Sequence, residues 1–147
     1  MSGELNLVKL CVGVEKVSDL ARWRDIRAAE AQASGVDYTP HHITRMRPRR
    51  EAELLDGGSL YWVFKGLILA RQRILRLDEV IGEDGIRRCA LIFAPELMLT
   101  EAHRRRAFQG WRYLVKADAP KDIGLYHEDQ EEIPGALRAE LSALGVL

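Results

Sequence analysis

Apolar residues are concentrated in the middle of the chain, and their spacing there is that of β-strands. In residues 60–65 both alternating faces are largely apolar, which is typical of a strand covered on both sides. Gly66 interrupts this strand, as glycine often does at a bulge or a sharp bend. The alternation resumes over residues 67–81 and predicts a second strand, although the apolar positions of residues 67–77 also fit a helix.

An Asp-Gly pair at Asp84 and Gly85 predicts that this second strand turns back as a hairpin, because both residues tolerate a positive φ. Residues 86–94 then form the partner strand. Pro95 ends the regular pairing because it lacks an N–H donor. The turn therefore favours a strand over a helix for residues 67–77.

Helices and further strands are expected on both sides of this hairpin. Ser18 suits a helix cap. After it Leu20, Trp23 and Ile26 form an apolar stripe, with Trp23 as a core anchor. Pro48 suits the first turn of a short helix. The expected elements are a strand at 5–14, a helix at 18–33, an extended segment at 41–46, a short helix at 48–55, the hairpin strands, a turn or short helix at 101–106, a strand at 107–115, a short strand at 123–127 and a terminal helix opened by Pro134.

This order of elements predicts a single α+β domain over residues 1–147. It favours a strongly bent, mostly antiparallel sheet or a small β-barrel, flanked by three helices, over a doubly wound parallel sheet. The apolar fraction of 47% and the charged fraction of 30% are those of a globular protein. The sequence has no apolar run of the roughly 20 residues that cross a bilayer and no convincing leader pattern. We therefore expect a cytoplasmic protein without membrane contact.

The net charge is zero, but the charges are unevenly distributed. Residues 1–44 hold 5 basic and 6 acidic side chains, residues 45–112 hold 14 and 9, and residues 113–147 hold 3 and 7. The basic middle contains a short arginine segment before the Pro48 helix, and this segment is a candidate contact for phosphate groups. The alternative is a solvated loop whose arginines pair with nearby acids. The four arginines of this segment are Arg45, Arg47, Arg49 and Arg50.

A block of aromatic and polar residues at 107–115 is the second candidate for binding. Aromatic rings can stack on a flat ligand, while Arg112 and Gln109 can bond its edge or its phosphate. The alternative is a final strand whose rings fill the core. The residues expected to line a base pocket are Gln109, Trp111, Arg112 and Tyr113.

The sequence contains none of the local motifs of a serine nucleophile, a phosphate-binding loop, a zinc protease or a paired Cys-x-x-Cys site. On a strand, His41 and His42 would point to opposite faces, so they cannot readily ligate one metal ion. Cys11 and Cys89 lie in apolar strands, where buried free thiols are expected. We therefore assign no catalytic residue and expect neither a metal site nor a cofactor.

Several blocks of the sequence resemble an uncharacterised alphaproteobacterial family of small single-domain proteins, a domain of unknown function; they are residues 7–14, 49–50 with 53–63, 70–74 and 108–114. The resemblance covers nearly the whole chain and implies no established activity, substrate or cofactor. The order of basic helix, Gly-Gly turn, apolar strand and hairpin is more weakly similar to PUA-like barrels and their ASCH and EVE relatives. That resemblance implies binding of RNA or modified bases in a cleft.

The residues favour a non-catalytic binding module for RNA, nucleotide or a modified base. Whether the protein is an enzyme stays open. One alternative is a small hydrolase acting on a nucleotide or phosphorylated metabolite, with Asp118 or Asp122 beside a histidine. The other is a structural or interaction protein in which the basic middle of one copy meets the acidic end of another, and the oligomeric state is likewise open.

Overall fold

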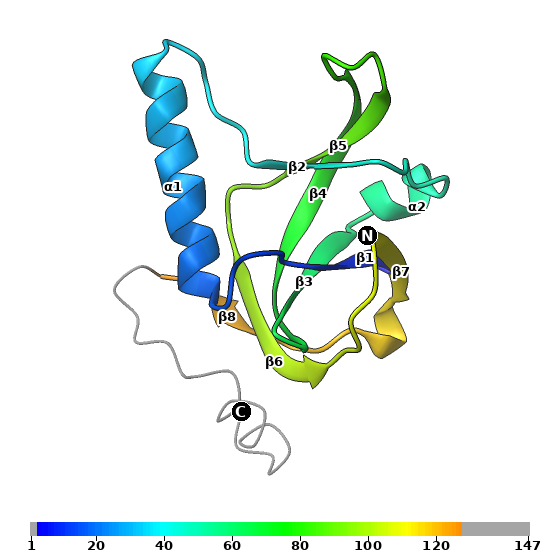
Figure 1. Cartoon of the computed structure of the whole chain (residues 1–147). Helices are drawn as coiled ribbons and strands as arrows, with labels where there is room; N and C mark the ends of the chain where they lie inside the picture. The colour runs from blue at the N-terminus through cyan, green and yellow to red at the C-terminus, as the bar shows by residue number, and fades with distance from the viewer. Residues whose placement is uncertain (1–2, 128–147) are drawn as a thin grey trace.

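The computed structural model describes residues 3–127. Eight strands and two α-helices, with one short 3-10 helix, follow one another along this part of the chain (Figure 1). They are β1 (Leu5–Leu10), α1 (Val17–Ala33), β2 (His41–Thr44), α2 (Glu51–Leu55), β3 (Ser59–Phe64), β4 (Leu67–Ile81), β5 (Arg87–Phe93), β6 (Met98–Arg104), β7 (Trp111–Val115), the 3-10 helix η1 (Lys116–Asp118) and β8 (Asp122–Leu125).

The strands form one mixed, strongly curled sheet with the order β2-β5-β4-β3-β1-β7, and β6 joins it by pairing with both β4 and β8. Most pairs are antiparallel, but β1 runs parallel to β3. The α+β prediction and the strong bend are confirmed. The small closed barrel is wrong, because β2 and β7 end the path without pairing to each other.

The central hairpin is confirmed. Lys65 and Gly66 turn β3 into β4 with φ values of 47° and 81°. At the other end of β4, the backbone N–H of Gly85 donates to the carbonyl of Gly82 at 2.9 Å, and the N–H of Ile86 donates to Oδ1 of Asp84 at 3.1 Å. The helical alternative for residues 67–77 is therefore wrong.

β4 is long because it pairs with strands in two parts of the sheet. Its first half pairs with β3 and β6, and its second half pairs with β5. The register between β4 and β5 shifts between Ile74 and Arg76, where the strand changes partners. Such irregularities bend a strand and increase its twist. The curl of the sheet follows from this division of β4.

Residues 101–106 form neither a turn nor a helix, contrary to the expectation. Residues 98–104 are strand β6, because an edge of β4 is available to pair with them. Thr100 and Ala102 face inward and are buried. The expected extended segment at 41–46 and the strand near 123 are confirmed as β2 and β8.

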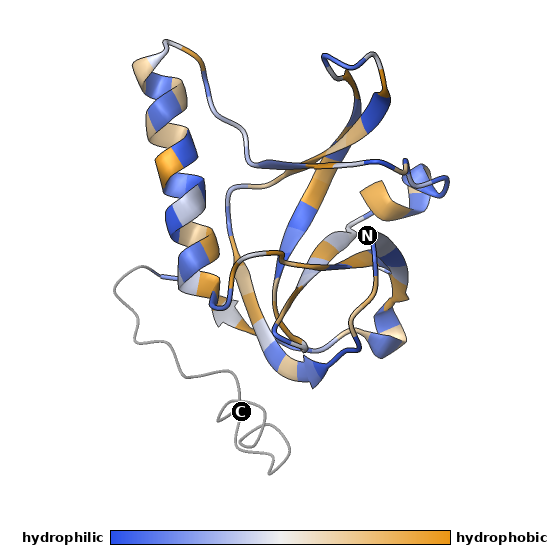
Figure 2. Ribbon diagram, in the orientation of Figure 1, coloured by the Kyte–Doolittle hydropathy of each residue, from blue (hydrophilic) through white to orange (hydrophobic). Residues whose placement is uncertain are grey.

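Alternating residues of β1 and β3 point into two apolar clusters on opposite faces of the sheet, and every residue of β3 is buried. Figure 2 shows the apolar colour concentrated on these central strands. The first cluster also takes residues from both helices. The second is smaller and includes Val8, Tyr61, Val63, Ile68 and Leu114, with Leu10 and Phe108 packed against it.

Helix α1 is buried mainly through its first turns, at Val17, Leu20 and Ala21. Farther along, Trp23 and Ile26 are 48% and 50% exposed, so the prediction that Trp23 anchors the core is wrong. The early residues already fill the contact with the sheet, and arginines alternate with the apolar positions beyond them.

Two of the three expected flanking helices are present as α1 and α2. The third, expected after Pro134, lies outside the described residues. Neither α-helix in residues 3–127 combines the length and apolar character that crossing a membrane would require.

Candidate functional site

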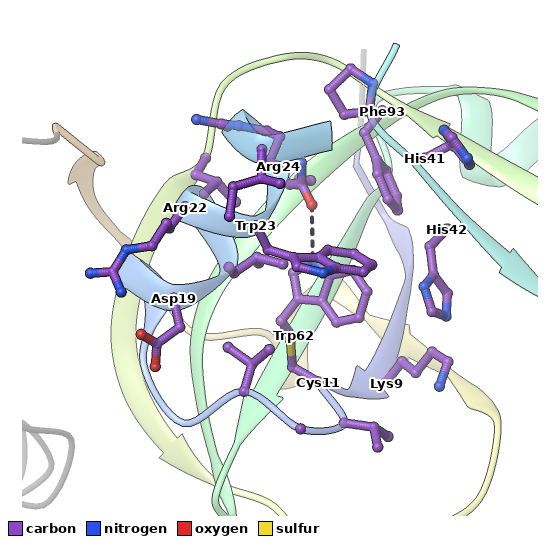
Figure 3. A pocket seen from close by; sticks show the side chains of 18 of the residues that line it. Lys9, Cys11, Asp19, Arg22, Trp23, Arg24, His41, His42, Trp62 and Phe93 are labelled. Atoms are coloured by element: carbon purple, nitrogen blue, oxygen red, sulfur yellow. Dashed lines mark hydrogen bonds between the residues drawn. The ribbon is translucent and has the colours of Figure 1, made fainter. Parts of the chain in front are cut away.

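A cavity of about 450 Å³ lies between α1 and the curled sheet (Figure 3). This volume is in the range of small-molecule binding sites. Its floor is formed by residues of β3, β4 and β5, and its sides by α1, the segment 38–42 and the loop after β1. Figure 3 shows Lys9, His42 and Trp62 on the sheet side, while Arg22 on the helix extends away from them.

A buried pair of polar groups forms part of the floor. The indole Nε1 of Trp62 donates a hydrogen bond to Oε1 of Gln72 at 2.9 Å, and both side chains are only 4% exposed. Because the indole nitrogen can only donate, this bond fixes which end of the Gln72 amide faces Trp62. The Nε2 group of Gln72 has no hydrogen-bond partner in residues 3–127. A buried amide without a partner is costly, so a ligand atom that accepts from it would be stabilised.

His42 forms an aromatic wall beside Trp62. The two rings meet edge to face with centroids 5.2 Å apart, and Trp62 meets Phe93 in the same manner at 6.2 Å. Burial lowers the pKa of His42 to about 4, and the nearby charges of Lys9 and His41 add to this effect. His42 is therefore neutral at pH 7 and presents one donor and one acceptor nitrogen.

Lys9 supplies a cation of the cavity. It projects from β1 on the face of the larger cluster, and no carboxylate in the described chain lies within 4.0 Å of its ammonium group. Partial burial lowers its pKa from 10.5, and the neighbouring Cys11 thiol opposes this shift. Burial in turn raises the pKa of Cys11 to about 12, so Cys11 is a neutral thiol.

The helix side of the cavity carries the half-exposed ring of Trp23. Trp23 carries the guanidinium of Arg27 over its ring at 4.0 Å, which holds the indole at the entrance. Arg24 donates from Nη1 to the carbonyl of Pro95 at 2.7 Å and so ties α1 to the end of β5. Burial raises the pKa of Tyr38, which remains a neutral donor in this wall.

The arrangement provides flat apolar walls, a buried amide donor and the ammonium group of Lys9, with Arg22 and Arg24 on the helix side. It suits a planar ligand with acceptor atoms at its edge and a negative group near Lys9. Among residues 3–127 no group of three or more His, Cys, Asp or Glu side chains could hold a metal ion. Within the same range no histidine lies within 4.0 Å of a carboxylate oxygen, so the hydrolase alternative has no such pair to act as its base.

The arginine segment and the aromatic block predicted from the sequence do lie together, at a different place. The Tyr113 hydroxyl accepts from the backbone N–H groups of Arg49 and Arg50 at 3.0 and 3.2 Å. Nε1 of Trp111 donates to the carbonyl of Met46 at 2.9 Å, and the two rings contact each other edge to face at 4.9 Å. These aromatic side chains fasten the arginine segment to β7.

Two arginines of that segment are paired with acids, as the solvated-loop alternative expects. Arg47 pairs with Glu51 at 2.9 Å and Arg50 pairs with Glu53 at 2.6 Å. Arg45, Arg49, Gln109 and Arg112 are exposed. None of the eight residues lines the cavity beside α1, so their role as ligand contacts stays a prediction.

A second cavity, of about 510 Å³, is built around an ion pair. Arg71 holds Asp122 through two hydrogen bonds of 2.7 and 2.8 Å and donates from Nη1 to the hydroxyl of Ser59 at 2.8 Å. This arrangement joins β4 to the start of β8. The charge of Arg71 in this cavity is therefore neutralised by Asp122.

The residues of the first cavity were missed because they come from six separate segments of the chain. A signal was present in the sequence. Lys9 and Gln72 are polar residues that alternate with apolar ones on one face of their strands, and Trp23 is a large ring on a largely polar helix. Polar residues at buried positions usually have a structural or functional partner.

A family model described as "Protein of unknown function (DUF1489)" matches residues 7–147. The search of curated proteins and the search of solved structures each found no match.

Proposed function

We propose, for a chain that belongs to the DUF1489 family of unknown function, a non-catalytic role in which the cavity beside α1 binds a nucleobase or nucleotide, free or as part of RNA. The observation that carries this proposal is the Nε2 group of Gln72, which is buried at the floor without a partner in the described chain. Carbonyl oxygens and ring nitrogens at the edge of a base accept hydrogen bonds from such an amide.

The surroundings of Gln72 support a base over an aliphatic ligand. Trp62 and His42 are fixed by their mutual edge-to-face contact, and Trp23 stands at the entrance. Stacking of a base on an aromatic side chain contributes about 1–3 kcal/mol and tolerates different bases. A base in the cavity would contact these rings and turn its edge toward Gln72. Modified bases fit the same description, because Trp23 on the helix side is 48% exposed and borders solvent.

Lys9 supports a ligand that carries a phosphate. A hydrogen bond between an ammonium and a phosphate is worth about 1.5–3 kcal/mol when it is shielded from water. Lys9 is half-buried and has no carboxylate partner in the described chain. A nucleoside monophosphate should therefore bind more tightly than the corresponding nucleoside.

The test is a fluorescence titration of the full chain with the four ribonucleoside 5′-monophosphates and their nucleosides. Trp23 and Trp62 line the cavity and should report binding. The variant Lys9→Met should raise the Kd of the monophosphates about tenfold, which corresponds to about 1.4 kcal/mol, and change the Kd of the nucleosides less than about twofold.

Lys16→Met is the matched control, because Lys16 is exposed at the start of α1 and does not line the cavity. It removes the same charge and should bind like the wild type. Trp23→Ala tests the aromatic wall at an exposed position, where the fold should be retained, and should weaken binding of every base. The proposal would be overturned if none of the eight compounds changed the fluorescence at about 1 mM. A Kd of about 1 mM corresponds to a binding free energy of about −4 kcal/mol, which is the limit of weak affinity.

A further inference from the structure

We propose that Phe108, the two arginines that lie over its ring and the two arginines beside them in the sequence form a second, phosphate-binding surface, whose partner is single-stranded RNA. The surface, called here the Phe108 cluster, lies at the end of β6 and in the connector to β7. It consists of Arg104, Arg105, Arg106, Phe108 and Arg112. This inference rests on the proposed function for its choice of RNA over other polyanions.

The charge of the cluster is not neutralised. Residues 103–112 contain four arginines and no aspartate or glutamate. In the described chain no carboxylate oxygen lies within 4.0 Å of any of these four guanidinium groups. Three arginines elsewhere in the described chain, Arg47, Arg76 and Arg88, differ because each has an acidic partner within 3.1 Å. A concentration of unpaired charge of one sign attracts a partner of the opposite sign.

Phe108 orders two of these groups. The guanidinium carbons of Arg105 and Arg112 lie 5.5 and 5.3 Å from the centre of its ring. The ring is itself packed against the smaller apolar cluster, so it is a fixed platform. A guanidinium that stacks on a ring through its face keeps its N–H groups directed outward at its edge. Such edges match the oxygens of a phosphodiester.

Backbone contacts hold the same arginines in place. Nη1 of Arg112 donates to the carbonyls of Gln109 and Trp111 at 2.9 and 3.1 Å, which leaves its Nε and Nη2 groups for a ligand. The backbone N–H of Arg105 donates to the carbonyl of Gly66 at 2.8 Å and fastens the connector to the β3–β4 turn. The cluster is therefore preorganised, which lowers the entropy lost on binding.

The cluster and the cavity lie on opposite faces of the sheet, on either side of the end of β1. Leu10 lines the cavity and also packs, with Phe108, against the smaller apolar cluster. Arg112 is the register partner of Val8, which points into the smaller cluster, whereas Lys9 lines the cavity. A chain that places one base in the cavity therefore has to bend around the end of β1, at Leu10, to lay its neighbouring phosphates on the Phe108 cluster. A single strand has the flexibility for this path, whereas the bases of a duplex are not free to enter a cavity.

The experiment measures fluorescence anisotropy of a 5′-fluorescein-labelled oligouridylate of about 12 nucleotides with the full chain, from about 50 to about 200 mM salt. For single strands the logarithmic salt slope is about −0.7 per phosphate neutralised. The double variant Arg105→Gln/Arg112→Gln should lower the affinity at least tenfold and reduce the slope by about 1.4, as expected for two lost contacts.

The control Arg76→Gln/Arg87→Gln removes the same charge from exposed arginines on β4 and β5 and should bind the oligonucleotide like the wild type. A wild-type slope and affinity in the Arg105/Arg112 variant would overturn the inference. Equal competition by an unlabelled duplex RNA of the same length would also overturn it. So would salt-sensitive self-association that the variant abolishes without any RNA binding, since the partner would then be a second copy of the chain.

The experiments can refute the cavity proposal and the Phe108 cluster proposal independently of each other. If mononucleotides bind and Lys9→Met weakens them, while the Arg105/Arg112 variant binds oligouridylate normally, only the Phe108 cluster is refuted. If no mononucleotide binds but the arginine variant still loses affinity and slope, the cavity proposal is refuted and the RNA-binding surface stands.

Discussion

The buried imidazole of His42 should make the stability of the fold depend on pH, and replacing it with phenylalanine tests this. In the folded protein the pKa of His42 is about 4, against an ordinary value of 6.5. As the pH falls below 6.5, the unfolded chain binds a proton that the folded chain does not, so the free energy of unfolding decreases until the pH reaches about 4. At about 1.4 kcal/mol per pKa unit, the total loss is about 3 kcal/mol, of which about 2 kcal/mol is lost by pH 5.

The assay is urea denaturation at about pH 7.5 and about pH 5, followed by far-UV circular dichroism. His42→Phe keeps a ring against the edge of Trp62 but cannot titrate. The decrease in the free energy of unfolding between the two pH values should be about 2 kcal/mol larger for the wild type than for this variant. His103→Gln, a change at an exposed histidine, should keep the wild-type decrease. Equal decreases in the wild type and His42→Phe would refute the reasoning, because the burial around His42 would then carry no cost for its charge.

Two further predictions concern the packing of the sheet. Gly58→Ala should lower the free energy of unfolding by roughly 2–4 kcal/mol, because an added Cβ would overlap the backbone carbonyl oxygens of Leu54 in α2 and Leu5 in β1. Neither oxygen can move without disturbing its own element. A loss below about 1 kcal/mol in a urea titration would contradict this prediction. Burial raises the pKa of both Cys11 and Cys89, so neither thiol should react with a thiol reagent at about pH 8 at the rate seen in urea, and rapid reaction of one equivalent in native buffer would contradict this.

The parts of the fold that the sequence predicted are those encoded locally. Gly66 and the Asp84-Gly85 pair form the turns at the two ends of β4. Across each turn β4 pairs with the strand next to it in the sequence, β3 or β5. The parallel pairing of β1 with β3 joins residues more than fifty positions apart, such as Leu7 and Leu60, and alternation of apolar residues carries no information on it. Strand β6 was missed because its arginine-rich end resembles the end of a helix, whereas the free edge of β4 decides its conformation.

The candidate site was less predictable than the fold. The sequence indicated arginines next to aromatic residues, and the structure does place Arg49 and Arg50 against Tyr113. It left open whether local acids neutralise these arginines, and the structure shows that they do so for Arg47 and Arg50. The cavity depends on how α1 is placed beside the sheet, and this placement follows from the burial of its first turns and from the hydrogen bond between Arg24 and Pro95. Such an arrangement is set by tertiary contacts, which propensity and periodicity do not describe.

The position of β1 between β3 and β7 has a consequence for how the chain acquires its structure during synthesis. β1 leaves the ribosome before both of its neighbours, which are encoded at residues 59–64 and 111–115. Its apolar residues therefore stay unpaired until residues 111–115 have been made, and closing such long loops is slow. During that interval the exposed segment can be captured by chaperones or by other nascent chains, so the rate of translation through the later strands affects the yield of native protein.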